Sequence, residues 1–89
     1  MNLQILTPEE VIFNGDVQSI ILPGKDGVFQ LLNNHAPIVS SLTSGNILIK
    51  AKETANLSKK INVQGENLTY DIKGGILEMN NNKVIILCD

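Results

Sequence analysis

The stretch that decides the fold of this chain lies between residues 22 and 38 and reads LPGKDGVFQLLNNHAPI. Pro23-Gly24 is a turn signal, because proline presets φ and glycine accepts positive φ at little steric cost. A short strand, Val28 to Leu32, follows. Asn33-Asn34 then turns the chain again, and Pro37 favours an extended conformation at the residue before it. We therefore predict a shaped surface loop held between strands, and such loops carry function more often than the scaffold beneath them.

Short runs of apolar and β-branched residues recur on both sides of this stretch, with turn signals about every 8–12 residues. This spacing is typical of an all-β sandwich or barrel, and periodicity alone does not separate the two. A single domain, residues 1–89, is all that the length allows. The predicted strands are residues 1–6, 11–13, 17–22, 28–32, 38–42, 47–51, 59–63, 68–73, 76–79 and 83–87.

Several connections between these strands can be predicted from local sequence. Thr7-Pro8-Glu9-Glu10 could start a helix, but the β-branched residues that follow favour a turn. Asn14-Gly15 is a hairpin signal, and Gly74-Gly75 indicates a bulge or a close backbone approach. The alternation around residues 59–63 predicts Ile61 and Val63 on one face, with Lys59-Lys60 at a solvated strand edge. Residues 52–57 have no clear period and are compatible with a helical turn.

Composition excludes several classes of protein. The formal net charge is -2, every basic residue is Lys, and aromatic residues make up only 3 %. Nucleic-acid binding usually needs a basic field, Arg and stacking aromatics, so we expect no nucleic-acid partner. The sequence has no apolar run long enough to span a bilayer and no signal-peptide pattern at its start. We expect a cytoplasmic protein, soluble unless a partner holds it at a membrane.

Candidate catalytic groups are scarce. His35 is the only histidine and Cys88 the only cysteine, so metal sites with several His ligands and most nucleophilic dyads are disfavoured. We expect His35 to hydrogen-bond the backbone of its own loop, and Cys88 to be a buried thiol in a terminal strand. Gly24-Lys25-Asp26-Gly27 lacks the spacing and the following helix of a phosphate-binding loop, so we predict a plain turn there.

Three segments together carry a resemblance to a known family. These are residues 3–15 (LQILTPEEVIFNG), the central stretch with its Leu-Pro-Gly and His-Ala-Pro motifs, and residues 74–89 (GGILEMNNNKVIILCD). Their order and spacing resemble the epsilon subunit of rotary (F-type) ATP synthases, over nearly the whole chain. The resemblance implies a two-layer β-sandwich of about ten short, mostly antiparallel strands.

The resemblance also implies a function without chemistry of its own. In the family, this domain sits in the central stalk, binds the gamma subunit on one side and rests on the loops of the c-ring, within a complex that includes alpha and beta subunits. Rotation of the ring, driven by protons or by sodium ions, at the cytoplasmic face of the inner cell membrane then supports ATP synthesis. The ring-facing residues that the motifs imply here are Gly24, Lys25, Asp26, Gly27, Val28, His35, Ala36 and Pro37.

Departures from the family pattern modify these expectations. Position 28 is Val where relatives often carry Glu, so Asp26 could supply the charge, and residues 53–67 are longer than in typical relatives. Relatives continue past a Leu-Ala-Asp tripeptide, here Leu87-Cys88-Asp89, into a helical hairpin that can inhibit ATP hydrolysis or bind ATP. We therefore expect no ATP site, no cofactor and no inhibition by such a hairpin. A generic β-sandwich adaptor or ligand-binding module with another partner remains the alternative.

Overall fold

The computed structural model describes residues 1–51 and 57–89. All elements of this part of the chain are β-strands. They are β1 (Asn2–Leu6), β2 (Val11–Gly24), β3 (Gly27–Leu32), β4 (Ile38–Leu42), β5 (Gly45–Leu57), β6 (Asn62–Gln64), β7 (Asn67–Ile72), β8 (Gly75–Asn80) and β9 (Lys83–Cys88). Among the described residues there is no helix long and apolar enough to cross a membrane.

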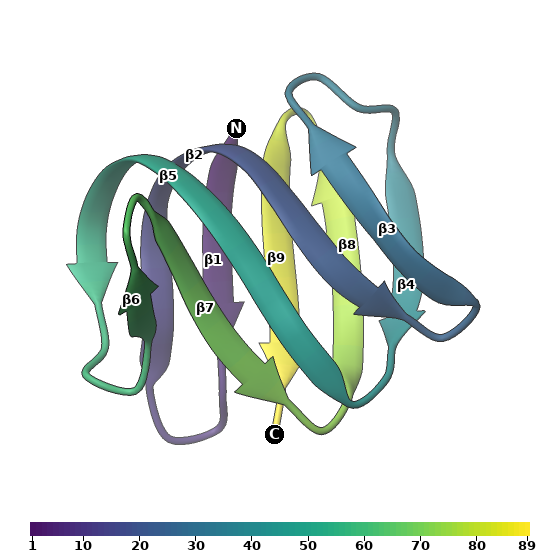
Figure 1. The fold of residues 1–89 in the computed structure, drawn as a ribbon. Helices are drawn as coiled ribbons and strands as arrows, with labels where there is room; N and C mark the ends of the chain where they lie inside the picture. The colour runs from purple at the N-terminus through teal and green to yellow at the C-terminus, as the bar shows by residue number, and fades with distance from the viewer.

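The strands form two layers that cross each other (Figure 1). In one layer the order is β1-β9-β8-β4, and in the other β5 lies between β2 and β7, with β3 on the far side of β2 and β6 on the far side of β7. The layers are joined because β2 also pairs with β1 and, at Gly24, with β4. All pairings are antiparallel except that of β1 with β9. The predicted two-layer, mostly antiparallel β-sandwich is confirmed, with nine strands.

The predicted hairpin at Asn14-Gly15 is wrong, because these residues lie inside the continuous strand β2. Their backbones pair with Gln4 and Leu3 of β1, and the register of β2 against β5 shifts between them. A further shift follows Val17, so the buried side chains change phase along the strand. Because the alternation is irregular, it predicted two short strands in place of one long strand. Pairing on both edges of β2 overrides the local turn preference of Asn-Gly.

Two other local predictions also need correction. The first turn of the central stretch is at Lys25-Asp26, and Pro23-Gly24 belongs to the end of β2. The strand predicted at residues 59–63 is shorter in the structure and consists of β6 (Asn62–Gln64), because the chain still turns at Lys59-Lys60. Ile61 is buried whereas Val63 is 65 % exposed, so they do not share a face. The helical turn considered at residues 52–57 falls on residues 52–56, which lie outside the described residues. The start of the lengthened segment 53–67 also lies there.

Close backbone packing explains the glycine that starts β8. A Cβ on Gly75 would lie 2.5 Å from the carbonyl oxygen of Leu87 on β9, whereas a Cβ on Gly74 would meet nothing nearer than 3.5 Å. The close approach predicted for Gly74-Gly75 is confirmed, and it concerns the second glycine. The β8–β9 turn at its other end uses Asn81 and Asn82, both at positive φ (51° and 60°), as the tightest hairpin turns require.

The core is formed by side chains from both layers. Its largest fully buried members are Phe13, Leu3, Ile5, Ile12, Ile20, Leu22, Leu31, Ile47, Ile49, Leu77, Met79 and Ile86. Each strand except β4, β6 and β7 contributes at least one of them, which ties the layers together. At 89 residues, a domain buries only about 60–65 % of the surface its unfolded chain exposes, so single changes in this core carry a large share of the stability.

A polar cluster fastens the first turn to the segment before β6. The turn itself is closed by Thr7, whose N–H donates to the carbonyl of Glu10 at 3.0 Å, so the predicted turn is confirmed. Lys60 Nζ lies 2.8 Å from Glu10 Oε2, and Ser58 Oγ donates to Glu10 Oε1 at 2.9 Å. Hydrogen bonds from Lys60 and then Ser58 lower the pKa of the Glu10 carboxyl.

The close approach at Gly75 gives a matched pair of substitutions. We expect Gly75→Ala to lower the free energy of unfolding by about 1–3 kcal/mol, because β9 must move to admit the methyl group. Gly74→Ala, which meets nothing closer than an ordinary van der Waals contact, should change it by at most about 0.5 kcal/mol. Urea denaturation of both variants measures this. Equal effects would contradict the packing account.

The Glu10 cluster predicts a pH dependence. A carboxyl whose pKa is lower in the folded state stabilises the fold above its unfolded pKa, near 4.5, and this contribution is lost as pH falls through the folded pKa. The wild-type chain should therefore unfold at a higher urea midpoint than Glu10→Gln at pH 7, and the difference should shrink as the pH falls below about 4.5. Glu66→Gln, at an exposed turn residue, is the control and should show no such convergence.

Candidate interaction surface

The first part of the predicted surface is the two-residue turn between β2 and β3. Only glycine fits at position 24, since a Cβ there would lie 2.6 Å from the Gly27 carbonyl oxygen and 2.7 Å from the Phe29 ring. Gly27 has φ of +131°, a conformation that other residues rarely adopt. The Lys25 N–H donates to the Ser41 carbonyl of β4 at 3.1 Å. The turn is thus exposed yet fixed to both layers.

The second part is the loop between β3 and β4, which contains His35, Ala36 and Pro37, all exposed. The His35 N–H donates to the Leu32 carbonyl at 3.3 Å, and its ring Nδ1 lies 2.7 Å from the Ala36 carbonyl oxygen. The prediction that His35 bonds the backbone of its own loop is confirmed. With Nδ1 as the donor in that bond, Nε2 is left as the ring atom available to a partner.

A network of asparagines holds this loop in place. The Asn34 N–H donates to Asn82 Oδ1 at 2.8 Å, and Asn82 Nδ2 donates back to Asn33 Oδ1 at 3.0 Å. The Met1 ammonium also donates to Asn33 Oδ1, at 2.9 Å, and to Asp16 at 3.0 Å. Asn34 itself has φ of +61°. Sequence reasoning identified Asn33-Asn34 as a turn but missed Asn82, because no local signal reveals a partner 48 residues away.

The structure does not bring the two parts together into one loop. The turn at Gly24–Gly27 and the His35 loop lie at opposite ends of β3 (Figure 1), which as a six-residue strand is about 17–20 Å long. β3 itself connects them along the surface, since Val28 is 74 % and Leu32 54 % exposed. The predicted residues therefore mark two ends of one exposed hairpin strand.

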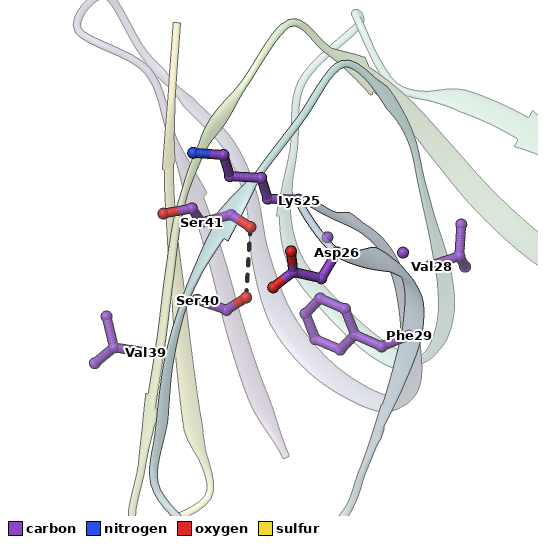
Figure 2. Close-up of a pocket in the computed structure, with 9 residues that line it drawn as sticks. Lys25, Asp26, Val28, Phe29, Val39, Ser40 and Ser41 are labelled. Carbon is purple, nitrogen blue, oxygen red and sulfur yellow. Dashed lines mark hydrogen bonds between the residues drawn. The ribbon is translucent and has the colours of Figure 1, made fainter.

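A cavity of about 460 Å³ lies between the β2–β3 turn and β4. Its lining residues come from both segments and are Gly24, Lys25, Asp26, Gly27, Val28, Phe29, Val39, Ser40 and Ser41. Figure 2 shows the Phe29 ring and the Asp26 carboxylate between the two segments, while the side chains of Val28 and Val39 point away from each other on the outside. Ser40 Oγ donates to the Ser41 carbonyl at 3.4 Å.

The titratable side chains of the predicted surface are Lys25, Asp26 and His35. No three His, Cys, Asp or Glu side chains gather as metal ligands in residues 1–51 and 57–89. His35 and Cys88 lie beyond opposite ends of β9, because His35 neighbours the Asn82 turn and Cys88 is the last residue of that strand. Cys88 is buried at the end of β9, so the prediction of a buried thiol in a terminal strand is confirmed. Burial, and then Asp89, raises the pKa of this thiol.

The asparagine network can be tested with two substitutions that keep positive φ accessible. Asn82→Gly removes both hydrogen bonds to the His35 loop and should lower the free energy of unfolding by about 1 kcal/mol. The Asn34 amide should then lose its protection from hydrogen exchange. Asn81→Gly changes the same turn without touching the loop and should leave that amide protected. Hydrogen exchange followed by NMR measures both, and equal protection in the two variants would contradict the network.

Comparisons with known proteins agree with this fold. The family model described as "ATP synthase, Delta/Epsilon chain, beta-sandwich domain" matches residues 1–89. ATP synthase epsilon chains from Chlorobium limicola, Leptospira borgpetersenii and Campylobacter concisus are 34 %, 33 % and 39 % identical to this chain, over 98 %, 100 % and 100 % of its length. The chain spans 86 %, 61 % and 60 % of those relatives.

Solved structures show the same fold in larger assemblies. A chain of the Euglena gracilis mitochondrial ATP synthase, in its OSCP/F1/c-ring part, superposes with a TM-score of 0.75 at 21 % identity, covering 97 % of this chain and 48 % of that one. A chain from the central stalk and c-ring of the Tetrahymena thermophila enzyme gives 0.71 at 20 % identity, covering 99 % and 62 %. Since the family model matches the whole chain and the epsilon chains are more than 30 % identical to it, the chain belongs to the family of ATP synthase delta/epsilon chains and carries its β-sandwich domain.

Proposed function

We propose that this chain is a non-catalytic rotor subunit in the central stalk of a proton-translocating ATP synthase. It connects the gamma subunit to the c-ring, so that rotation of the ring is delivered to the catalytic alpha and beta subunits. The observation that carries this proposal is the match to the epsilon family over residues 1–89. The surface described above fits the role, since it offers contact without catalytic groups.

A coupling subunit must transmit torque, and the structure of the exposed turn suits that task. A flexible contact would absorb rotation as local motion. Here the Lys25 N–H is bonded to Ser41, the Thr43 N–H donates to the Pro23 carbonyl at 2.9 Å, and the Phe29 ring lies against Gly24. Force applied at the turn therefore reaches β2 and β4, and through them both layers of the sandwich.

The proposed ring-facing residues are those at the two ends of β3, namely Gly24, Lys25, Asp26, Gly27, Val28, His35, Ala36 and Pro37. Val28, 74 % exposed, would make an apolar contact, with Lys25 and Asp26 beside it as charged groups of opposite sign. We propose that residues 1–89 form a single domain. The chain is a peripheral subunit of a membrane-bound complex, and we place it on the cytoplasmic face of the cell membrane.

The proposal can be tested by purifying the tagged chain from gently solubilised membranes of its source. We expect the gamma subunit, the c-ring and the catalytic subunits to be recovered with it, in amounts that mass spectrometry can compare. Recovery of the chain alone, under conditions that keep the ATP synthase intact, would overturn the proposal. It would instead favour the alternative of a free adaptor or ligand-binding sandwich.

Three variants sharpen this test. Val28→Lys places a charge in the proposed contact and should reduce c-ring recovery at least about tenfold, as expected for the loss of roughly 1.4 kcal/mol. Val63→Lys is the matched control, because Val63 is also exposed (65 %) but lies on β6, at the opposite edge of the same layer. His35→Ala should leave ATP synthesis within about tenfold of the wild type, whereas a catalytic histidine would cost far more.

A further inference from the structure

Two strands leave an edge of the sandwich open beside the cavity described above. Among the described residues, β3 pairs only with β2. β4 pairs with β8 along its whole length, but with β2 at Gly24 alone. The cavity of about 460 Å³ is lined by residues of both open edges. Hydrogen-bonding backbone thus borders a space that is not filled by this chain.

The register of β3 shows which of its backbone groups are free. Gly24 and Gly27 close a two-residue turn, so they exchange both backbone hydrogen bonds, and pairs of this kind alternate along the hairpin. Phe29 and Leu31 then also bond β2. The backbone N–H and C=O groups of Val28 and Gln30 point away from β2, and no hydrogen bond within the described residues reaches them.

The same reasoning applies to β4. The Lys25 N–H donates to the Ser41 carbonyl, so Ser41 directs its backbone towards the turn and the cavity. Backbone groups alternate along a strand, so Val39 directs its N–H and C=O to the same side. They too have no partner among the described residues. Val28 of β3 and Val39 of β4 both line the cavity, from different layers, whereas Gln30 lies outside its lining.

This edge also lacks the features that normally prevent strand addition. Open edges in natural proteins are usually very short or carry charges, Pro or bulges. β3 has six residues, GVFQLL, with no charge and no Pro, and five of the six are exposed or half-buried. β6, the other open edge of the same layer, has only three residues. The β6 edge, where no partner is proposed, is thus too short to favour strand addition. The β3 edge, at the proposed contact, has no feature that prevents it.

The charges of the lining indicate which kind of segment fits. Of the lining residues, Lys25 and Asp26 carry charges of opposite sign, and the others carry none. An added strand would place alternate side chains beside Val28, on the outer face, and beside Phe29, on the inner one (Figure 2). An extended, uncharged segment with apolar residues at alternate positions matches this surface.

We propose that an extended, uncharged segment of a partner ATP synthase subunit pairs as an added strand with the open edge of β3, beside β4. Main-chain hydrogen bonds would provide the affinity and the flanking apolar side chains the register. The inference rests on the proposed function, since it specifies how the partner engages the exposed hairpin. It extends the contact from the ends of β3 to the strand between them.

Hydrogen exchange measured on the assembled complex and on the free chain tests this directly. We expect the amides of Val28 and Gln30, and with them that of Val39, to exchange quickly in the free chain and to be protected in the complex. If the complex forms while these amides exchange as in the free chain, strand addition is overturned and the proposed function stands. If no complex forms, the proposed function fails, and the inference with it.

Substitutions provide an independent measurement. Gln30→Pro removes an N–H that β2 does not use, so the chain should still fold, as circular dichroism would check, while its affinity for the complex falls at least tenfold. Gln30→Ala removes the side chain and keeps the N–H, and it should bind like the wild type. Equal binding by both variants would overturn the proposal. Dimerisation of the free chain with protection of the same amides would also overturn it, because the occupant would then be a second copy.

Discussion

The structure depends on one strand that belongs to both layers. β2 runs without a break from Val11 to Gly24 and pairs with β1, β3, β4 and β5. Its buried side chains, among them Phe13, Ile20 and Leu22, reach the core along its whole length because bulges correct their phase. Breaking this strand would disconnect the two layers, whereas most other strands contact only their neighbours in one layer.

The position of the exposed hairpin follows from this strand. β3 is the direct continuation of β2 through a turn with no spare residues, and Gly24 is also the point at which β2 pairs with β4. The turn is therefore anchored where the layers meet. A contact made at this turn is supported by the strands that form the hydrophobic core. A small domain can therefore hold an exposed turn in a fixed position.

The opposite end of β3 is held by a different kind of interaction. Polar side chains, mainly Asn33 and Asn82, fix the His35 loop through hydrogen bonds to backbone and to each other. Such bonds contribute about 1 kcal/mol each, less than the burial of a large apolar side chain. The two ends of the hairpin are thus held by different groups, backbone hydrogen bonds to β4 at the turn and asparagine side chains at the His35 loop. Between them lies an open strand edge, where a partner could add the hydrogen bonds that this chain leaves unmade.

Local sequence was sufficient for the features that depend on near neighbours. Alternating apolar residues and regular turn signals predicted an all-β fold. Gly24 and Gly27 predicted a turn, His35 a bond within its own loop, and Gly75 a close approach. The His35 bond has its partner within a few residues. The glycines were recognisable because only a residue without a Cβ fits where two backbones approach closely. The family motifs added the choice of a sandwich over a barrel.

Tertiary structure decided the features that depend on long-range pairing. Asn14-Gly15 has the local preference of a hairpin, yet pairing with β1 and β5 on its two sides keeps it in a strand. Asn82 holds a loop 48 residues earlier in the chain, and Val63 is exposed because its strand is short and lies at an edge. The open edges of β3 and β4 could not be foreseen either. Whether a strand has one neighbour or two is a property of the whole sheet, and local propensity carries no information about it.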